Sequence, residues 1–137
     1  MNIDGVTTGI VLDHIEAGKS LRIYELLGLE KIKSSVAVIQ NVKSSKYGKK
    51  DIIKIDEIID IDFNVLGYVD PNITVNVVRN GELAHKSHMS LPVELSGVLK
   101  CRNPRCITSI ENVPSKFKLS DRKNRIYTCE YCDTEVK

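Results

Sequence analysis

Apolar and polar residues follow short, regular patterns through the first ninety residues, and these patterns predict strands and helices. Five segments rich in β-branched residues and bounded by turn residues are predicted strands: 7–15, 36–42, 50–55, 73–79 and 82–89. Apolar residues at helical spacing predict a helix over 17–29, and a short helix is placed at about 62–68. Asn80-Gly81 is typical of a tight hairpin turn between the last two strands.

The order of these elements predicts the fold class. Strand, helix, strand, strand, helix, strand, strand is expected to form an α+β domain of ferredoxin-like type, an antiparallel sheet with helices on one face plus an edge strand. Ser90-Leu91-Pro92 and Ser96-Gly97 mark a linker. We therefore expect one domain at 1–96 and a small, β-rich domain at 97–137.

Four cysteines dominate the second domain. They form a C-x4-C pair and a C-x2-C pair separated by 22 residues, namely Cys101, Cys106, Cys129 and Cys132. Two such pairs provide a tetrahedral all-thiolate shell for one zinc ion, with Zn–S distances of ~2.3 Å. Because no coordination position remains for water or substrate, the zinc is expected to be structural.

Two alternatives use the same cysteines. A disulfide framework suits a secreted chain, but the opening residues 1–5 are polar and do not resemble a signal peptide. A redox Cys-x-x-Cys motif usually lies where a strand meets a helix, and the second pair does not have that context. Zinc is the interpretation that we favour, and reduced thiols favour a cytoplasmic location.

Composition limits the remaining possibilities. Residues 97–137 contain few large apolar side chains, so metal binding, worth on the order of 10–16 kcal/mol in small zinc modules, is expected to stabilise them. No apolar run approaches the ~20 residues of a membrane span, and no membrane association is expected.

The charge distribution bears on nucleic-acid binding. The 137 residues carry a net charge of +2, and residues 97–137 hold 9 Lys and Arg against 5 Asp and Glu. Four thiolates and one zinc dication would reduce that local excess to +2. A zinc-ribbon nucleic-acid binder remains an alternative, which a steep salt dependence of binding would favour, but no dense basic face supports it.

Several charged residues lie inside the predicted strands. Asp13-His14 ends the first strand, Lys54 lies between two isoleucines, and Lys86 lies in the last strand. Singly, each suits a solvated strand end or a lysine whose ammonium group reaches water. Together they would suit a nucleoside triphosphate, with lysines on phosphates and a carboxylate on ribose hydroxyls. Periodicity alone does not establish that they converge.

Two enzyme-like readings are weaker. Gly18-Lys19-Ser20 ends like a phosphate-binding loop, but Asp13 stands where that motif requires glycine. Asp13-His14 is a candidate catalytic pair without a nucleophile placed by the sequence. We therefore do not expect the chain to be an enzyme.

Three stretches resemble one known family. They are Val11-Leu12-Asp13-His14-Ile15, Gly48-Lys49-Lys50-Asp51-Ile52-Ile53-Lys54-Ile55 and Lys86-Ser87-His88-Met89-Ser90-Leu91-Pro92. With the two cysteine pairs that follow, they are similar, in the same order, to the regulatory chain of aspartate carbamoyltransferase. The resemblance covers essentially the whole chain.

This resemblance implies a function and partners. The first domain is expected to bind CTP or ATP as allosteric effectors, and the zinc domain to dock onto the catalytic chain, which alone transfers the carbamoyl group in pyrimidine biosynthesis. Regulatory chains are expected to pair as homodimers through their nucleotide domains. Three such pairs would bridge two catalytic trimers in a dodecamer.

The resemblance also assigns nucleotide-binding residues by position. It implies that Asp13 contacts the ribose, His14 and Lys86 the phosphates, and Lys54 the ribose and the nearby phosphate region. Lys50 is expected beside them. Four apolar positions are expected to line the base pocket, where backbone groups distinguish cytosine from adenine: Val6, Val11, Val78 and Leu83.

Overall fold

A computed structural model describes residues 7–46 and 48–136 of the chain. The chain divides into two compact units, Met1–Ser90 and Leu91–Lys137. The division lies earlier than the boundary expected at residue 96, because strand β6 (Glu94–Ser96) pairs with strand β7 (Lys116–Asp121) and so belongs to the second sheet. Within the described ranges, no helix is long and apolar enough to span a membrane.

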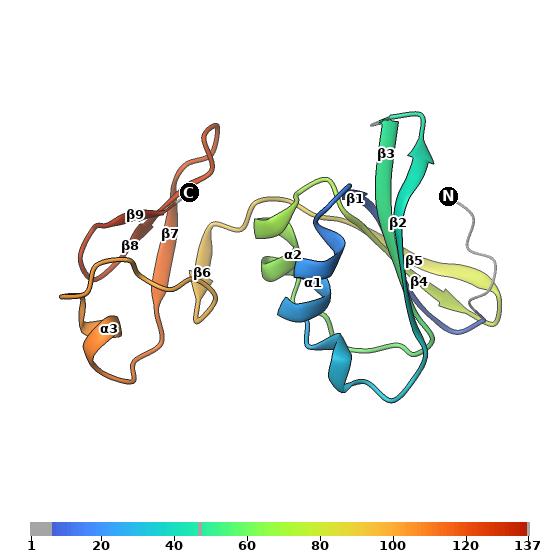
Figure 1. Cartoon of the computed structure of the whole chain (residues 1–137), viewed down its shortest axis with the longest axis horizontal. Coiled ribbons are helices and arrows are strands. Elements are labelled where there is room, and N and C mark those ends of the chain that lie inside the picture. The colour runs from blue at the N-terminus through green and yellow to red at the C-terminus, as the bar shows by residue number, and fades with distance from the viewer. Residues whose placement is uncertain (1–6, 47, 137) are drawn as a thin grey trace. The chain divides into compact units, whose positions relative to one another are not determined.

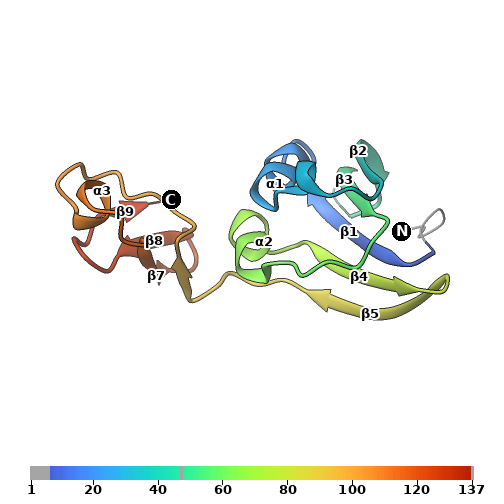
Figure 2. The same cartoon turned by 90° about the horizontal axis from the view of Figure 1, so that it is seen from below.

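The first unit has the predicted α+β architecture. Its elements are β1 (Gly9–Glu16), α1 (Ser20–Leu26), the 3-10 turn η1 (Leu29–Lys31), β2 (Val36–Ser44), β3 (Gly48–Ile55), α2 (Phe63–Val69), β4 (Thr74–Arg79) and β5 (Glu82–His88). Antiparallel pairing gives the strand order β2-β3-β1-β4-β5, and α1 and α2 lie on the same face (Figure 1, Figure 2). This order, with β5 added at the edge, confirms the ferredoxin-like expectation.

The main core lies between the sheet and the helices. Residues that face each other across antiparallel strands point to the same side of the sheet, so the pairs of Ile10 with Ile55 and of Leu12 with Ile53 share one face. Ile23 of α1 and Leu66 of α2 are buried in the same cluster. Fully burying one such side chain contributes roughly 1.5–3 kcal/mol. These apolar strand residues are therefore explained by a face that two helices cover.

The helix boundaries follow local chemistry. α2 begins after Asp62, whose carboxylate accepts hydrogen bonds from the N–H groups of Asn64 and Val65. α1 is shorter than predicted, because Gly28 adopts a left-handed conformation with φ of 64° and the chain continues as η1. Of the predicted range 17–29, only its last residue, Leu29, belongs to η1.

The β4–β5 hairpin matches its sequence signal. Asn80 and Gly81 have φ of 52° and 80°, the positive values that a type I′ turn requires. Gly81 also donates its N–H to the Thr7 carbonyl at 2.8 Å. The turn therefore holds the register of both strands.

Two β-bulges flank β3 at the same level. The pairing of β1 with β3 shifts between Leu12 and Ile15, and that of β2 with β3 shifts between Ile39 and Val42. Each bulge contains one non-glycine residue with φ of 60°, His14 in β1 and Asn41 in β2. Neither bulge was predicted from the sequence.

Asp51 of β3 connects these bulges to α1. One carboxylate oxygen accepts the Asn41 N–H at 3.0 Å, and the other accepts from the Gly18 N–H, the Ser20 N–H and the Ser20 hydroxyl. Burial alone would raise the pKa of Asp51, but the hydrogen bonds from Ser20, Asn41 and Gly18 outweigh it and hold the pKa below its ordinary value. Asp51 is thus a charged link between the β2 bulge and the start of α1.

The second unit is small and β-rich, as expected. It contains β6, α3 (Ile107–Ile110), β7, β8 (Ile126–Cys129) and β9 (Glu135–Val136), with the sheet order β6-β7-β8-β9. Leu95, Phe117 and Tyr127 are buried in it, and the Tyr127 hydroxyl donates to the Pro92 carbonyl at 2.7 Å. Because so few large apolar side chains are buried here, metal binding by the cysteines is expected to supply much of the stability of this unit.

Candidate functional site

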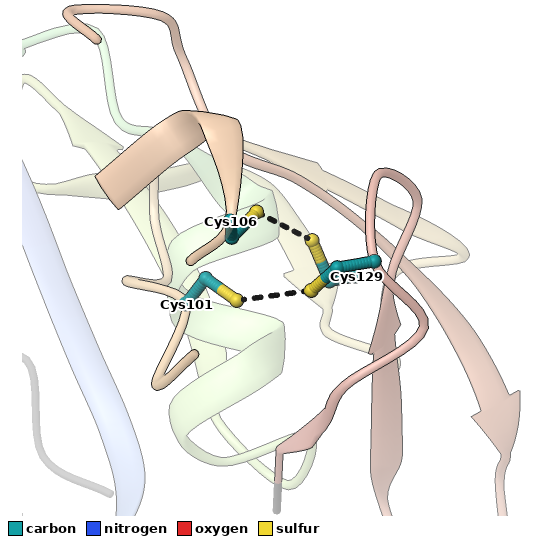
Figure 3. Close-up of side chains that lie close together, drawn as sticks. Cys101, Cys106 and Cys129 are labelled. Atoms are coloured by element: carbon teal, nitrogen blue, oxygen red, sulfur yellow. Dashed lines mark hydrogen bonds between the residues drawn. The ribbon is translucent and has the colours of Figure 1, made fainter. Parts of the chain in front are cut away.

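The four cysteines of the second unit meet at one point. Cys101 and Cys106 flank the loop before α3, Cys129 ends β8, and Cys132 lies in the turn before β9. Their four sulfur atoms all lie within 4.8 Å of one another. Figure 3 shows the sulfurs of Cys101, Cys106 and Cys129 directed toward a common centre. The spacing prediction that the two pairs converge is therefore confirmed.

The sulfur separations fit a tetrahedral metal. Cys101 Sγ lies 3.5 Å from Cys132 Sγ, and Cys106 Sγ lies 3.8 Å from Cys129 Sγ. A tetrahedron with metal–sulfur bonds of ~2.3 Å has edges of about 3.8 Å. Both distances are too long for a disulfide, whose S–S bond is ~2.05 Å. The donor set therefore suits a divalent metal held by four thiolates.

Hydrogen bonds stabilise two of the thiolates. Thr108 Oγ1 lies 3.2 Å from Cys106 Sγ, and Thr134 Oγ1 lies 3.1 Å from Cys132 Sγ. The hydroxyl and N–H of Thr134 lower the pKa of Cys132 to about 6, and those of Thr108 lower the pKa of Cys106. These two cysteines are therefore the ones most readily deprotonated for metal binding.

The first cysteine of each pair is in a different environment. Burial raises the pKa of Cys101 to about 12, partly offset by a hydrogen bond from the Asn103 N–H, and burial likewise raises the pKa of Cys129. A metal cation would supply the positive charge that these buried thiolates require. With four protein ligands the centre leaves no open position for catalysis.

A row of four residues crosses the face of the first sheet that the helices do not cover. Val11 of β1 lies opposite Lys54 of β3 and Asn76 of β4, and Asn76 lies opposite Lys86 of β5. Directly opposed residues share a face, so both lysines project from the same side as Val11. With strands about 4.8 Å apart, the row from Lys54 to Lys86 spans about 14 Å.

Asp13 lies on this same face two residues after Val11, and the bulge in β1 brings His14 to it as well. Successive residues of a regular strand point to opposite faces, but His14 Nδ1 lies 3.0 Å from Thr74 Oγ1 and 3.9 Å from Asp13 Oδ2. Asp13 is only 1% exposed, and its other oxygen, Oδ1, lies 3.0 Å from the ammonium nitrogen of Lys50. The predicted group of Asp13, His14 and Lys50 is therefore contiguous.

The pKa of His14 reflects the charged groups around it. Burial is the main cause that lowers the pKa of His14 below 6.5, and Asp13 acts in the opposite direction. Three ammonium groups lower the pKa of His14 further: Lys50, Lys46 and Lys86. These lysines come from β3, the β2–β3 turn and β5, so their charges converge on His14.

An open pocket of about 550 Å³ lies beside this group. Its wall includes His14, Lys50 and Lys54, and an apolar floor is formed by Ile39, Val42 and Ile52. The hairpin residues Lys43 and Lys46 also line it. Sequence reasoning did not single out these two lysines, because both lie beyond the predicted strand 36–42 and strand periodicity carries no information about which pocket they line.

Two models of known protein families match this chain. The first is described as "Aspartate carbamoyltransferase regulatory chain, allosteric domain" and matches residues 1–90, and the second as the "metal binding domain" of the same chain and matches residues 93–137. The chain belongs to the family of aspartate carbamoyltransferase regulatory chains.

Curated relatives of the same name cover nearly the whole chain. The regulatory chain of Clostridium botulinum strain Hall is 50% identical, over 97% of this chain and 92% of its own length. That of Clostridium acetobutylicum is 46% identical over 100% and 94%, and that of Bifidobacterium longum is 42% identical over 100% and 99%. The resemblance seen in the sequence is confirmed.

The family assigns a role to each unit of this regulatory chain. The ferredoxin-like unit is the allosteric domain, and the four-cysteine unit is the metal-binding domain. A regulatory chain is a non-catalytic subunit, which implies a catalytic chain of aspartate carbamoyltransferase as its partner. The expectation that the chain is not itself an enzyme is therefore confirmed.

Of the four apolar positions expected in this regulatory chain's base pocket, two are buried, one is exposed and one lies outside the described residues. Val11 and Val78 are buried together with Ile52 on the face of the basic row, and Leu83, 49% exposed, lies opposite Val78. The Val11 carbonyl accepts a hydrogen bond from the Asn76 side-chain amide at 3.3 Å. Val6 lies outside the described residues.

Proposed function

We propose that this regulatory chain binds CTP and ATP on the basic face of its first unit and transmits their binding to a catalytic chain. The observation that carries the proposal is the gathering of basic groups on one face of the sheet: Lys54 and Lys86 project from the row that crosses it, and His14, Lys46 and Lys54 line the adjacent pocket. Clustered ammonium groups favour a polyanion such as a triphosphate.

The individual contacts proposed here are those that the family resemblance implies by position. Lys86 and His14 would bind the phosphates, Lys54 the ribose and the phosphate nearest it, and Asp13 the ribose hydroxyls. Lys50 is already paired with Asp13, so its role is to hold that carboxylate in place. The base would lie against the apolar residues Val11, Val78, Leu83 and Val6.

We propose zinc as the metal of the second unit. Four thiolates at tetrahedral separations are the donor set that zinc prefers in structural sites. The metal would stabilise the surface that docks onto the catalytic chain. Two apolar side chains on α3, Ile107 at 39% exposed and Ile110 at 68%, support docking beside the metal centre.

The larger assembly is also a proposal. Regulatory chains would pair through their first units, and three pairs would join two catalytic trimers in a cytoplasmic dodecamer that controls pyrimidine biosynthesis. A nucleotide would alter catalysis only through its different affinities for the two states of the assembly, typically a coupling of ~1–3 kcal/mol.

Calorimetric titration of CTP and of ATP tests nucleotide binding. Lys86→Ala should weaken binding on the order of 10- to 100-fold, because a charge-assisted hydrogen bond contributes about 1.5–3 kcal/mol. Lys33→Ala is the matched control, since it removes the same charge from an exposed loop residue. Undiminished affinity in Lys86→Ala, or equal loss in both variants, would contradict the assigned site.

Sedimentation with the catalytic chain tests docking. Ile110→Asp should prevent co-assembly, because it places a carboxylate in the centre of a proposed apolar contact. Val93→Asp changes a residue of similar exposure, 65%, beside β7 and should assemble normally. Normal assembly of Ile110→Asp would remove α3 from the interface.

A further inference from the structure

Two threonines occupy equivalent positions around the four-cysteine centre. Each follows the second cysteine of its pair at the same spacing, Cys106-x-Thr108 and Cys132-x-Thr134, and each hydroxyl lies 3.1–3.2 Å from that cysteine's sulfur. Thr108 lies in the first turn of α3, whereas Thr134 immediately precedes β9. The same contact therefore arises in two different local folds.

Coordination fixes the direction of these hydrogen bonds. A metal-bound cysteine is a thiolate and has no proton to donate, so the threonine hydroxyl must donate to the sulfur. Hydrogen bonds to a charged acceptor are about twice as strong as neutral ones. Four thiolates around a divalent cation carry a net charge of −2, and three of these cysteines are buried. Neutral donors that stabilise this charge without competing for the metal suit the site.

Thr134 also binds the other cysteine of its pair. Its carbonyl accepts the Cys129 N–H at 2.9 Å while its hydroxyl contacts Cys132. In the first pair, the Cys106 carbonyl accepts the Ser109 N–H at 2.8 Å, which holds Cys106 at the start of α3. Backbone hydrogen bonds therefore hold Thr134 beside its cysteine pair and hold Cys106 at the start of the helix that contains Thr108.

We propose that Thr108 and Thr134 are positioning residues of the metal centre, whose hydroxyls orient the Cys106 and Cys132 thiolates and strengthen metal binding. The inference rests on the zinc centre proposed above. Outer-shell hydrogen-bond partners of metal ligands typically change metal affinity about 10- to 100-fold when removed. Each hydroxyl is expected to contribute near the lower end of that range, because the sulfur retains backbone N–H donors.

Isosteric variants of the full-length chain test this role. Thr108→Val and Thr134→Val remove the hydroxyl but keep the shape, whereas Thr108→Ser and Thr134→Ser keep the hydroxyl. Thr128→Val is the control, because the Thr128 hydroxyl donates to Ser120 Oγ, away from the sulfurs. Zinc affinity is measured by competition with a chromophoric chelator, and the sulfur-to-metal charge-transfer band is recorded with cobalt in place of zinc.

The expected results separate hydrogen bonding from packing. Each valine variant should bind zinc about tenfold more weakly and shift the cobalt band, whereas the serine variants and Thr128→Val should match the wild type. Wild-type affinity and an unshifted band in both valine variants would overturn the proposal. If a valine variant does not fold, a folded serine variant with normal zinc affinity supports the hydroxyl role, and a serine variant that also fails overturns it. Failure of the wild type to bind zinc or cobalt would instead refute the metal centre itself.

Discussion

The buried ion pair between Lys50 and Asp13 allows a quantitative test of the allosteric domain. Lys50 is 7% exposed and Asp13 1%, and the ammonium nitrogen lies 3.0 Å from the carboxylate. Lys50→Met keeps most of the apolar stem but removes the charge. The Asp13 carboxylate would then remain buried, with the His14 N–H at 2.7 Å as the hydrogen bond that the structure still provides.

The expected loss of stability is large. Removing one partner of a buried ion pair destabilises a protein by about 3–5 kcal/mol, because the remaining charge is uncompensated. In a domain of this size, each kcal/mol lowers the melting temperature by roughly 4–8 °C, so a loss of ~3 kcal/mol corresponds to about 12–24 °C. That loss is a substantial part of a typical total stability of ~5–15 kcal/mol.

Urea unfolding of the metal-loaded chain, followed by far-UV circular dichroism, measures this change. Amide hydrogen exchange in β1 and β3 reports on the first sheet alone. Lys49→Met is the matched control, since Lys49 is the exposed neighbour on the same strand and should change stability by less than about 0.5 kcal/mol. In a double-mutant cycle, adding Asp13→Asn to Lys50→Met should cost less than the sum of the two single changes. Equal effects of Lys50→Met and Lys49→Met would refute the reasoning.

Three other predictions follow from geometry and charge. CTP affinity should rise as pH falls from about 8 to about 6, because phosphates favour the charged form of His14, whose pKa lies below 6.5 in the free chain. Calorimetry should find this pH dependence of CTP affinity absent in His14→Gln, and an unchanged pH dependence in that variant would contradict the prediction. Removing the metal with a chelator should unfold residues 91–137 but leave the first sheet protected in hydrogen exchange, since each unit has its own core; simultaneous loss of both units would contradict it. Gly9→Ala should reduce thermal stability by about 2 kcal/mol or more, because the added Cβ would overlap the Ile55 carbonyl oxygen and lie 3.1 Å from the Glu57 nitrogen; an unchanged melting temperature would show that this strand can shift.

The elements of the first unit could be predicted because local chemistry and tertiary structure agree. The strand around Ile10 and Leu12 is a continuous apolar run because it is buried on both faces, with Ile10 and Leu12 against the helices and Val11 against Ile52 and Val78. Asn80-Gly81 has the backbone conformation that its residue types favour. The predicted helix 17–29 runs past the observed end of α1 at Leu26 because its range included Gly28, which has a left-handed conformation, and Leu29, which begins η1.

The metal centre could be predicted more completely than the anion-binding face. Cysteine spacing specifies two loops that a single metal can join, and the sulfurs do converge. The position of His14 depends on a bulge, which moves its side chain to the other face of the sheet, and no residue type in this segment indicates that a bulge forms there. For the same reason, the lysines of the β2–β3 hairpin could not be assigned to the pocket from strand periodicity.

Asp51 places a mechanical constraint on the allosteric domain. Its carboxylate holds the β2 bulge with one oxygen and the start of α1 with the other. The hairpin that walls the basic pocket therefore cannot swing away from β3 unless the first turn of α1 moves with it or gives up its acceptor. A ligand that pressed against the hairpin would exert force on a helix on the opposite side of the sheet.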